Sequence, residues 1–136
     1  MPPVELHWQQ AELNEEAAHS AREQFPDWAV TMCFYAVIHY VESHAIKARG
    51  KLDDLIGNRS NRHSQRREYV HNLAYRLREK DLIDAYEFVE DSSHKARYLT
   101  SIDKTAREHY ANLGCDNVFE DLEYIRDLFK DLMHGT

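Results

Sequence analysis

The sequence predicts an all-α protein: an up-and-down helical bundle of four to five antiparallel helices in a single domain over residues 1–136. The chain has only four Gly and three Pro, so few residues interrupt a helix. No segment alternates apolar and polar residues for long enough to predict a sheet. With 136 residues, 43% of them hydrophobic, the chain is long enough to bury one core.

Pro26 separates the first two predicted helices. We expect the first helix over Val4–Gln24, with a buried stripe formed by Leu6, Leu13, Ala17, Ala21 and Phe25. Asp27 is expected to cap the second helix, Trp28–Arg49. Between Trp28 and Val41 that helix is apolar on almost every side. This pattern is typical of a helix surrounded by protein, at the centre of a bundle or at a dimer interface.

The middle of the chain predicts a loop and two further helices. Lys51–Arg62 contains Gly-Asn and Ser-Asn pairs, which favour turns. The third helix is expected to begin near His63 or Ser64. Asp81 is expected to cap a fourth helix that ends near Tyr98. The inward residues of these two helices are predicted to be Val70, Leu73, Leu77, Leu82, Tyr86 and Val89.

The C-terminal part predicts one clear helix after an ambiguous segment. Residues 99–116 fit either a loop or a short helix over Asp103–Leu113 that ends at Gly114. Asn117 and Glu120 have the spacing of a capping box and predict the start of the last helix. Its apolar residues recur at alternating spacings of four and three, as in a coiled-coil seam: Val118, Leu122, Ile125, Phe129 and Leu132.

A basic cluster interrupts this acidic chain, whose formal net charge is −7. Five basic or titratable residues fall within nine positions that hold no acid: Arg59, Arg62, His63, Arg66 and Arg67. Guanidinium groups beside a helix N-terminus suit phosphate oxygens, so the cluster predicts a phosphate-binding site. The alternative is ion pairing with the acidic residues of the last helix.

Two other constellations have alternative interpretations. Tyr35 and His39 lie one turn apart on the apolar second helix, so His39 is either a hydrogen-bonded core residue or a general acid–base group beside Tyr35. Glu16-x-x-His19 and Glu68-x-x-His71 match the pattern of di-iron bundles. Because His and Glu are abundant here, about one such match is expected by chance, and two matches are not persuasive. We therefore expect no metal site and no cofactor.

The sequence also bears on location. The first residues lack a basic segment followed by an apolar one, so we expect no secretory signal. The longest apolar stretch is too short to span a membrane. Neither Cys33 nor Cys115 belongs to a CxxC motif. These features predict a soluble cytoplasmic protein with no membrane partner.

The segment from Asp27 to Glu42, DWAVTMCFYAVIHYVE, resembles the second helix of HEPN-like proteins (higher eukaryotes and prokaryotes nucleotide-binding domain). In that family the helix often reads Asp-Trp-Ala followed by Phe-Tyr-Ala-x-x-His-Tyr. Ala11–Asn14 is similar to the family's first helix, and His63-x-x-Arg66 to its entry from a loop into a helix. Ala96–Tyr98 resembles the Arg-Tyr pair that closes its fourth helix.

This resemblance implies a dimerising helical bundle that acts on RNA. Active members of the superfamily are metal-independent ribonucleases, often in toxin–antitoxin or defence systems, and other members are non-catalytic nucleotide- or RNA-binding modules. The nuclease motif is Arg, four to six residues, then His. Arg66 and His71 form the one match to it here.

The leading hypothesis is therefore a homodimeric RNA-processing or RNA-binding protein. If it cleaves RNA, a neutral His would take the 2′-OH proton and Arg would stabilise the phosphorane. The candidate catalytic residues are His63 and Arg66, then His39 and Arg97; the candidate phosphate contacts are Arg59, Arg62, Arg67, Tyr98 and Tyr35. The alternative is a non-catalytic dimeric interaction or accessory protein with a cognate partner. In it, the apolar second helix and the last-helix seam are interfaces.

Overall fold

The protein is described by a computed structural model that covers residues 3–49, 62–99, 102, 104–111 and 115–134. This part of the chain contains six helices and no strand, which confirms the all-α prediction. The helices are α1 (Pro3–Ala21), α2 (Pro26–Arg49), α4 (Arg62–Leu77), α5 (Lys80–Tyr98), α6 (Ala106–His109) and α7 (Cys115–His134).

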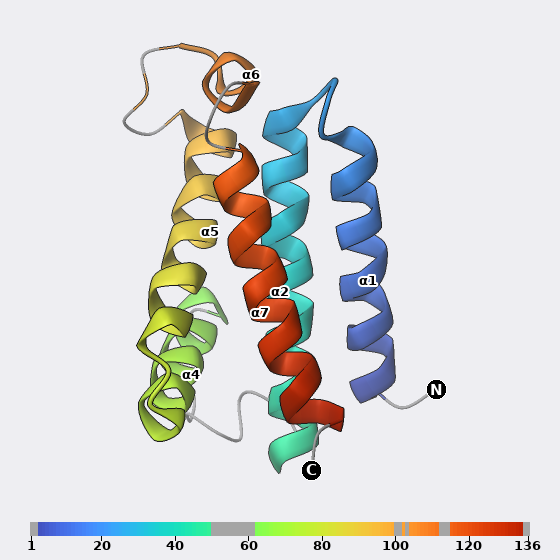
Figure 1. The fold of residues 1–136 in the computed structure, drawn as a ribbon, viewed down its shortest axis with the longest axis vertical. Coiled ribbons are helices and arrows are strands. Elements are labelled where there is room, and N and C mark those ends of the chain that lie inside the picture. The colour runs from blue at the N-terminus through green and yellow to red at the C-terminus, as the bar shows by residue number, and fades with distance from the viewer. Residues whose placement is uncertain (1–2, 50–61, 100–101, 103, 112–114, 135–136) are drawn as a thin grey trace.

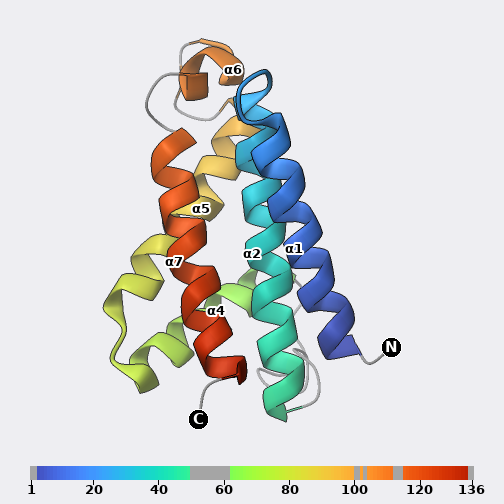
Figure 2. The ribbon, with the colours of Figure 1, turned by 45° about the vertical axis from the view of Figure 1, so that its right-hand side comes forward.

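Four long helices, α1, α2, α5 and α7, run alternately up and down (Figure 1). The other two helices lie outside this alternation. α4 lies at the lower end of the bundle beside the first half of α5, and the short α6 lies at the opposite end (Figures 1 and 2). The predicted up-and-down bundle is thus present, with α4 as an addition to it.

α2 is the central helix and packs against α1, α4, α5, α6 and α7. Its side chains Val30, Phe34, Val37 and Val41 are completely buried. This packing accounts for the apolar residues on almost every side of the helix. The neighbours that surround α2 all belong to the same chain, so its composition does not require a dimer interface.

The predicted buried stripe of α1 is wrong. Leu6 is 52% exposed, Leu13 is 58% exposed, and Ala17 is exposed as well. The face that packs on α2 contains the small residues Ala11 and Ala18, which let the two helices approach closely. Of the predicted stripe only Ala21 packs against the core. The helix ends at this residue, and Phe25 beyond it is exposed.

Several predicted helix starts shift by a few residues. α2 begins at Pro26, a residue suited to the first helical position, so Asp27 lies inside the first turn rather than at the cap. α5 begins at Lys80, which places Asp81 in its first turn. α7 begins at Cys115, so the predicted capping box at Asn117 is wrong.

The ambiguous segment before α7 contains a short helix with a capping box of its own. The Thr105 side chain accepts from the backbone N–H of Glu108, and the Glu108 carboxylate accepts from the backbone N–H of Thr105. The short-helix alternative is thus correct for Ala106–His109. The predicted loop Lys51–Arg62 lies outside the described residues except for Arg62, with which α4 begins.

α7 confirms the predicted seam. Its residues Val118, Leu122, Ile125 and Phe129 are completely buried, and Leu132 packs against the core. The seam faces α2 and α5 within the chain and is therefore not a free interface. The inward residues predicted for the third and fourth helices are likewise in or against the core.

Candidate functional site

A surface cavity of about 270 Å³ lies where the beginning of α4 meets the second half of α5. Its lining residues are Phe34 from α2, His63 and Arg67 from α4, and Glu90, Asp91, His94 and Arg97 from α5. On α4 these residues are four positions apart, and on α5 they recur at helical spacings, so each helix presents one face to the cavity. The fold thus brings two Arg and two His together at one place.

The contact with Arg66 assigns the hydrogen-bond role of Nδ1 in His63. Its ring stacks on Phe34 with centroids 5.9 Å apart, and its Nδ1 lies 2.9 Å from Nη2 of Arg66. Arg can only donate, so Nδ1 of His63 is the acceptor, and in the neutral ring the hydrogen is on Nε2. Partial burial and the charge of Arg66 lower the pKa of His63, which favours this neutral form.

Arg97 contributes a positive charge to the cavity that no described carboxylate pairs with. Its Nε donates to the backbone oxygen of Ser93 at 3.3 Å, and its guanidinium lies 5.1 Å from the ring centroid of Tyr98. The acids of the cavity have other partners. Glu90 accepts from Arg67 at 3.0 Å and raises the pKa of Arg67, and Asp91 pairs with Lys95 at 3.2 Å.

Arg66 does not line the cavity, although the sequence predicts it, together with His63, as a first candidate catalytic residue. It is only 5% exposed, and its Nη1 donates to Oε1 of Glu42 at 3.2 Å. Arg66 therefore supports His63 from behind and connects it to α2. The position follows from helix geometry, because Arg66 is three residues from His63 and points toward the core beside it.

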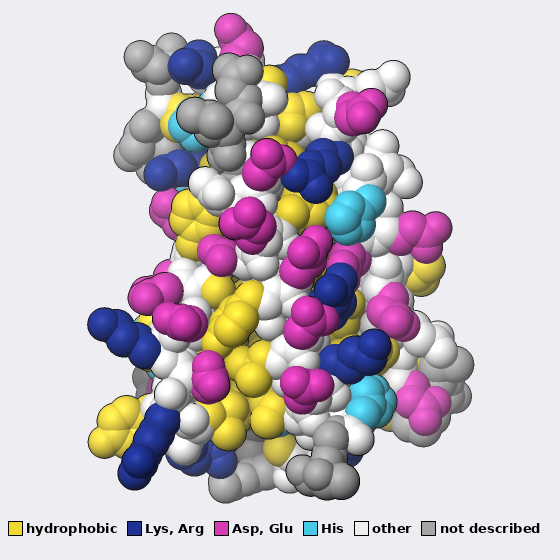
Figure 3. Space-filling model, viewed as in Figure 1, with side chains coloured by type: hydrophobic (Ala, Val, Ile, Leu, Met, Phe, Trp, Pro, Cys, Tyr) yellow, Lys and Arg dark blue, Asp and Glu magenta, His cyan; other side chains and the backbone are white. Residues whose placement is uncertain are grey.

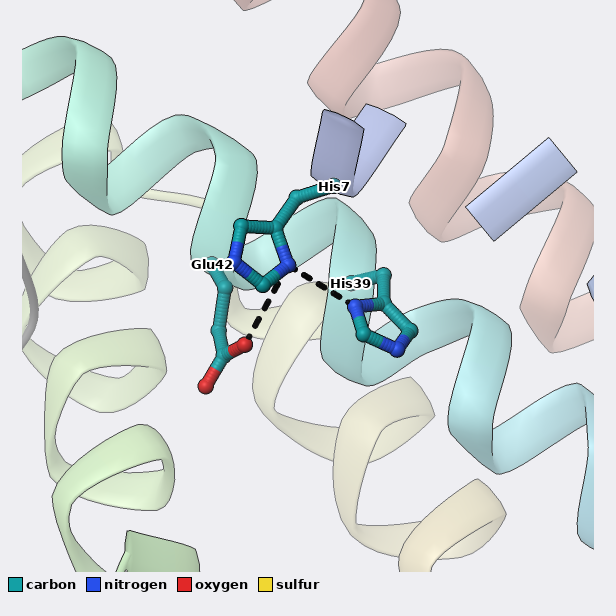
Figure 4. A group of neighbouring side chains, drawn as sticks. All are labelled: His7, His39 and Glu42. Atoms are coloured by element: carbon teal, nitrogen blue, oxygen red, sulfur yellow. Dashed lines mark hydrogen bonds and ion pairs between the residues drawn. The ribbon is translucent and has the colours of Figure 1, made fainter. Parts of the chain in front are cut away.

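His39 lies in a second group of side chains, on the far side of Arg66 from His63. Its Nδ1 is 2.8 Å from Nδ1 of His7, and the same His7 nitrogen is 3.4 Å from Oε2 of Glu42 (Figure 4). The two rings stack with centroids 5.1 Å apart. Burial, and then the neighbouring His7, lower the pKa of His39. His39 is thus neither a simple core histidine nor a cavity residue.

The predicted phosphate contacts are spread more widely than the sequence suggested. Arg67 lines the cavity, whereas Arg62 is exposed at the start of α4 and Arg59 lies outside the described residues. Tyr98 is 63% exposed beside Arg97, and Tyr35 is 41% exposed on α2. Neither tyrosine lines the cavity.

The alternative of pairing with the acidic last helix is wrong for the two Arg residues whose contacts are described. Arg66 pairs with Glu42 of α2 and Arg67 with Glu90 of α5. The acidic side chains of α7 are mostly exposed, and acids are spread over the face of the molecule on which α7 lies (Figure 3). They therefore form a solvated surface there.

Neither sequence motif assembles a site. Glu16 and His19 are both exposed, and His71 lies 3.4 Å from Glu87, so the two E-x-x-H pairs do not converge. Arg66 and His71 of the predicted nuclease motif also have separate partners. They are five residues apart and thus project from different sides of α4.

Sequence reasoning did not find His94 and His7, and it gave Glu42 no role in a site. A signal was available for two of them, because His94 is three residues before Arg97 and Glu42 is three residues after His39. Residues at this spacing share a helix face. No signal marked His7, because its contact with His39 depends on how α1 packs along α2.

We found no protein-family model, no curated protein and no solved structure that matches the chain. The geometry of the two groups of side chains therefore carries the functional argument. Among the described residues, no helix is long and apolar enough to cross a membrane.

Proposed function

We propose that this chain acts on single-stranded RNA, binding a backbone phosphate in the cavity between α4 and α5 and cleaving the RNA there without a catalytic metal ion. The observation that carries the proposal is the guanidinium of Arg97, which has no carboxylate partner among the described residues and lines the same cavity as His63 and His94. A planar guanidinium is well suited to bind a phosphate through two parallel hydrogen bonds.

The two histidines have different roles in this proposal. His63 has its Nε2 protonated while Nδ1 accepts from Arg66, so it donates a hydrogen bond to a non-bridging phosphate oxygen rather than acting as the base. His94 takes the 2′-OH proton. The 2′ oxygen then attacks phosphorus, the bond to the 5′ oxygen breaks, and that oxygen takes a proton from water. Arg97 stabilises the charge of the phosphorane, and the products are a 2′,3′-cyclic phosphate and a 5′-hydroxyl.

Two further features support RNA as the substrate. Tyr98 is exposed beside Arg97, where an unstacked base could lie on its ring. The resemblance of the α2 sequence to HEPN-like proteins, whose active members are ribonucleases, points the same way. The chain would then belong to that family, in which defence and toxin–antitoxin roles are common.

The test measures binding and cleavage separately. Cleavage of a fluorescent RNA is followed in excess EDTA, and binding by anisotropy of an analogue in which 2′-deoxy nucleotides prevent cleavage. We expect His94→Gln to slow cleavage at least about 100-fold and leave binding intact. We expect Arg97→Ala to weaken both, and to reduce the dependence of log Kd on log salt by about one unit.

Arg107→Ala is the matched control, because Arg107 also lies 5.1 Å from an aromatic ring centroid but on α6, away from the cavity. It should leave binding and cleavage unchanged. Wild-type protein that binds RNA without cleaving it would overturn the catalytic part of the proposal. Absence of binding, or an equal loss in Arg107→Ala, would overturn the whole.

The alternative function, a non-catalytic dimeric interaction protein, is favoured by one observation. Leu6 and Leu13 are exposed and seven residues apart, and therefore lie on the same face of α1. Sedimentation of the same purified protein distinguishes the two cases. A dimer that does not bind RNA would support the interaction role, whereas a monomer that binds RNA would contradict it.

A further inference from the structure

Two imidazoles and a carboxylate converge between α1 and α2. His7 near the start of α1 lies against His39 and Glu42 of α2, and one ligand atom from each lies within 4.8 Å of the others (Figure 4). The three side chains are half-buried. The group is separate from the cavity, which none of the three lines.

Nδ1 of His7 has two close neighbours that compete for one hydrogen. Nδ1 of His7 is 2.8 Å from Nδ1 of His39 and 3.4 Å from Oε2 of Glu42. A neutral imidazole has one hydrogen, so Nδ1 of His7 can donate to His39 or to Glu42 but not fully to both. If it donates to Glu42, it has no lone pair left to accept from His39. One hydrogen on Nδ1 of His7 therefore cannot satisfy both of its neighbours.

A cation bound among the three ligand atoms, which lie within 4.8 Å of one another, would interact with a lone pair of each. Ligand atoms around tetrahedral Zn²⁺ lie about 3.3 Å apart, as follows from bonds of about 2.0–2.1 Å. The separation of 3.4 Å between His7 and Glu42 already fits, and the 2.8 Å between the two nitrogens requires a small opening. Two nitrogens and one oxygen suit Zn²⁺ or a similar transition metal better than Ca²⁺ or Mg²⁺, which prefer oxygen.

The carboxylate is also oriented as in known metal centres. Oε1 of Glu42 accepts from the buried Arg66 at 3.2 Å, while Oε2 is the oxygen directed toward His7. Outer hydrogen bonds of this kind fix the orientation of a ligand and raise metal affinity. Arg66 leaves Oε2 available to a metal ion.

We propose that His7, His39 and Glu42 bind one Zn²⁺ ion, with water as a fourth ligand, and that the ion ties the start of α1 to α2. The water position follows from the partial exposure of the group. The site has a structural role and takes no part in the cleavage proposed for the cavity. It therefore stands whether or not the chain acts on RNA.

The test uses the full chain after removal of metal with a chelator. We expect Zn²⁺ to bind with one-to-one stoichiometry in calorimetry and to raise the melting temperature by several degrees. Co²⁺ should give visible absorption typical of four-coordinate nitrogen and oxygen ligands. Ca²⁺ and Mg²⁺ at the same concentration should leave the melting temperature unchanged, and an equal rise with either would contradict the proposed ligand chemistry.

Three variants locate the ion. His7→Ala, His39→Ala and Glu42→Gln should each weaken Zn²⁺ binding at least about 10-fold, and Glu42→Gln keeps an oxygen that can accept from Arg66. His19→Ala is the matched control. His19 lies 3.9 Å from Glu15 on α1, and among the described residues this pair belongs to no group of three possible metal ligands. Equal loss in His19→Ala, or wild-type binding by all three variants, would show adventitious binding and overturn the site.

RNA cleavage in EDTA is measured at a temperature at which circular dichroism shows the metal-free protein to be folded. Failure of the metal site then appears as a missing Zn²⁺ effect on melting. Failure of the RNA proposal appears as absent binding and cleavage in the same folded protein. The two outcomes are independent.

Discussion

Two carboxylates near the contact between α1 and α2 have similar surroundings and different capabilities. Glu15 of α1 accepts from Arg126 of α7 at 2.6 Å, and Glu42 of α2 accepts from Arg66 of α4 at 3.2 Å. Each pair connects the α1–α2 hairpin to another helix of the bundle. In both cases an arginine and further donors surround a carboxylate that is largely removed from water.

The two carboxylates differ in the partner that each has in addition to its arginine. The hydroxyl of Tyr40, only 1% exposed, donates to Glu15 at 2.8 Å, and burial raises the pKa of this phenol further above the usual range. The Tyr40 hydroxyl therefore stays protonated, and remains a donor, at neutral and mildly acidic pH. Glu42 has His7 at 3.4 Å instead, with His39 behind it, whereas His19 lies 3.9 Å from Glu15 and is exposed. Imidazoles exchange protons near neutral pH and bind metals, so this network can respond to conditions while the Glu15 network holds the fold.

Removal of Glu15 is expected to have the largest effect on stability. Glu15→Ala leaves Arg126 without its buried partner and Tyr40 without an acceptor. We expect the free energy of unfolding to fall by about 3 kcal/mol, measured by urea denaturation. The neighbouring Glu16 is exposed, and Glu16→Ala should change stability by less than about 0.5 kcal/mol. A loss of unfolding free energy below about 1 kcal/mol in Glu15→Ala would contradict the stabilising role assigned to the Glu15 network.

Acid should destabilise the protein through His44, a largely buried histidine of α2. Burial lowers the pKa of His44 from 6.5 to about 4, so the unfolded chain binds a proton that the folded protein does not. Stability from this group is complete above pH 6.5 and is lost as the pH falls toward 4. The expected loss between pH 7 and pH 5 is about 2 kcal/mol.

The measurement is the difference between wild type and His44→Gln in urea denaturation at pH 7 and pH 5. Gln can keep the hydrogen bond to the hydroxyl of Tyr69, which lies 2.7 Å from Nδ1 of His44. We expect a shallower loss of stability in the variant. Parallel curves for wild type and His44→Gln would contradict the assignment.

The sequence predicted the helices well because their signals are local. Few Gly and Pro, the apolar run in α2 and the seam of α7 all depend on spacing along the chain, and the structure contains the corresponding helices. The prediction of the buried residues of α1 was wrong, for a reason that spacing along the chain does not reveal. Its leucines point outward, and its buried face has Ala11, Ala18 and a carboxylate whose partners come from other helices.

The candidate site was predicted in part. The sequence singled out His63, Arg67 and Arg97, and the fold brings them to one cavity. It also singled out Arg66 and His39, but neither residue lines the cavity. Which neighbouring helix a side chain faces depends on tertiary packing, and the sequence alone does not show this. Arg66 and His39 both connect to Glu42, directly or through His7, and this network appears only when α1, α2 and α4 are assembled.

The smallest of these effects should come from removing only the hydrogen bond that Tyr40 donates to Glu15. Tyr40→Phe removes the hydroxyl and leaves the Glu15–Arg126 pair in place. We expect a loss of about 1.5 kcal/mol, the usual magnitude for a hydrogen bond to a charged group. The unfolding free energy of this variant should run parallel to that of wild type from pH 7 to pH 5, because the phenol stays protonated throughout. A change in that slope would mean that the Glu15 network also responds to acid, and the distinction between the two carboxylates would fail. Tyr35→Phe, at a 41% exposed position on the same helix, controls for the loss of a hydroxyl alone.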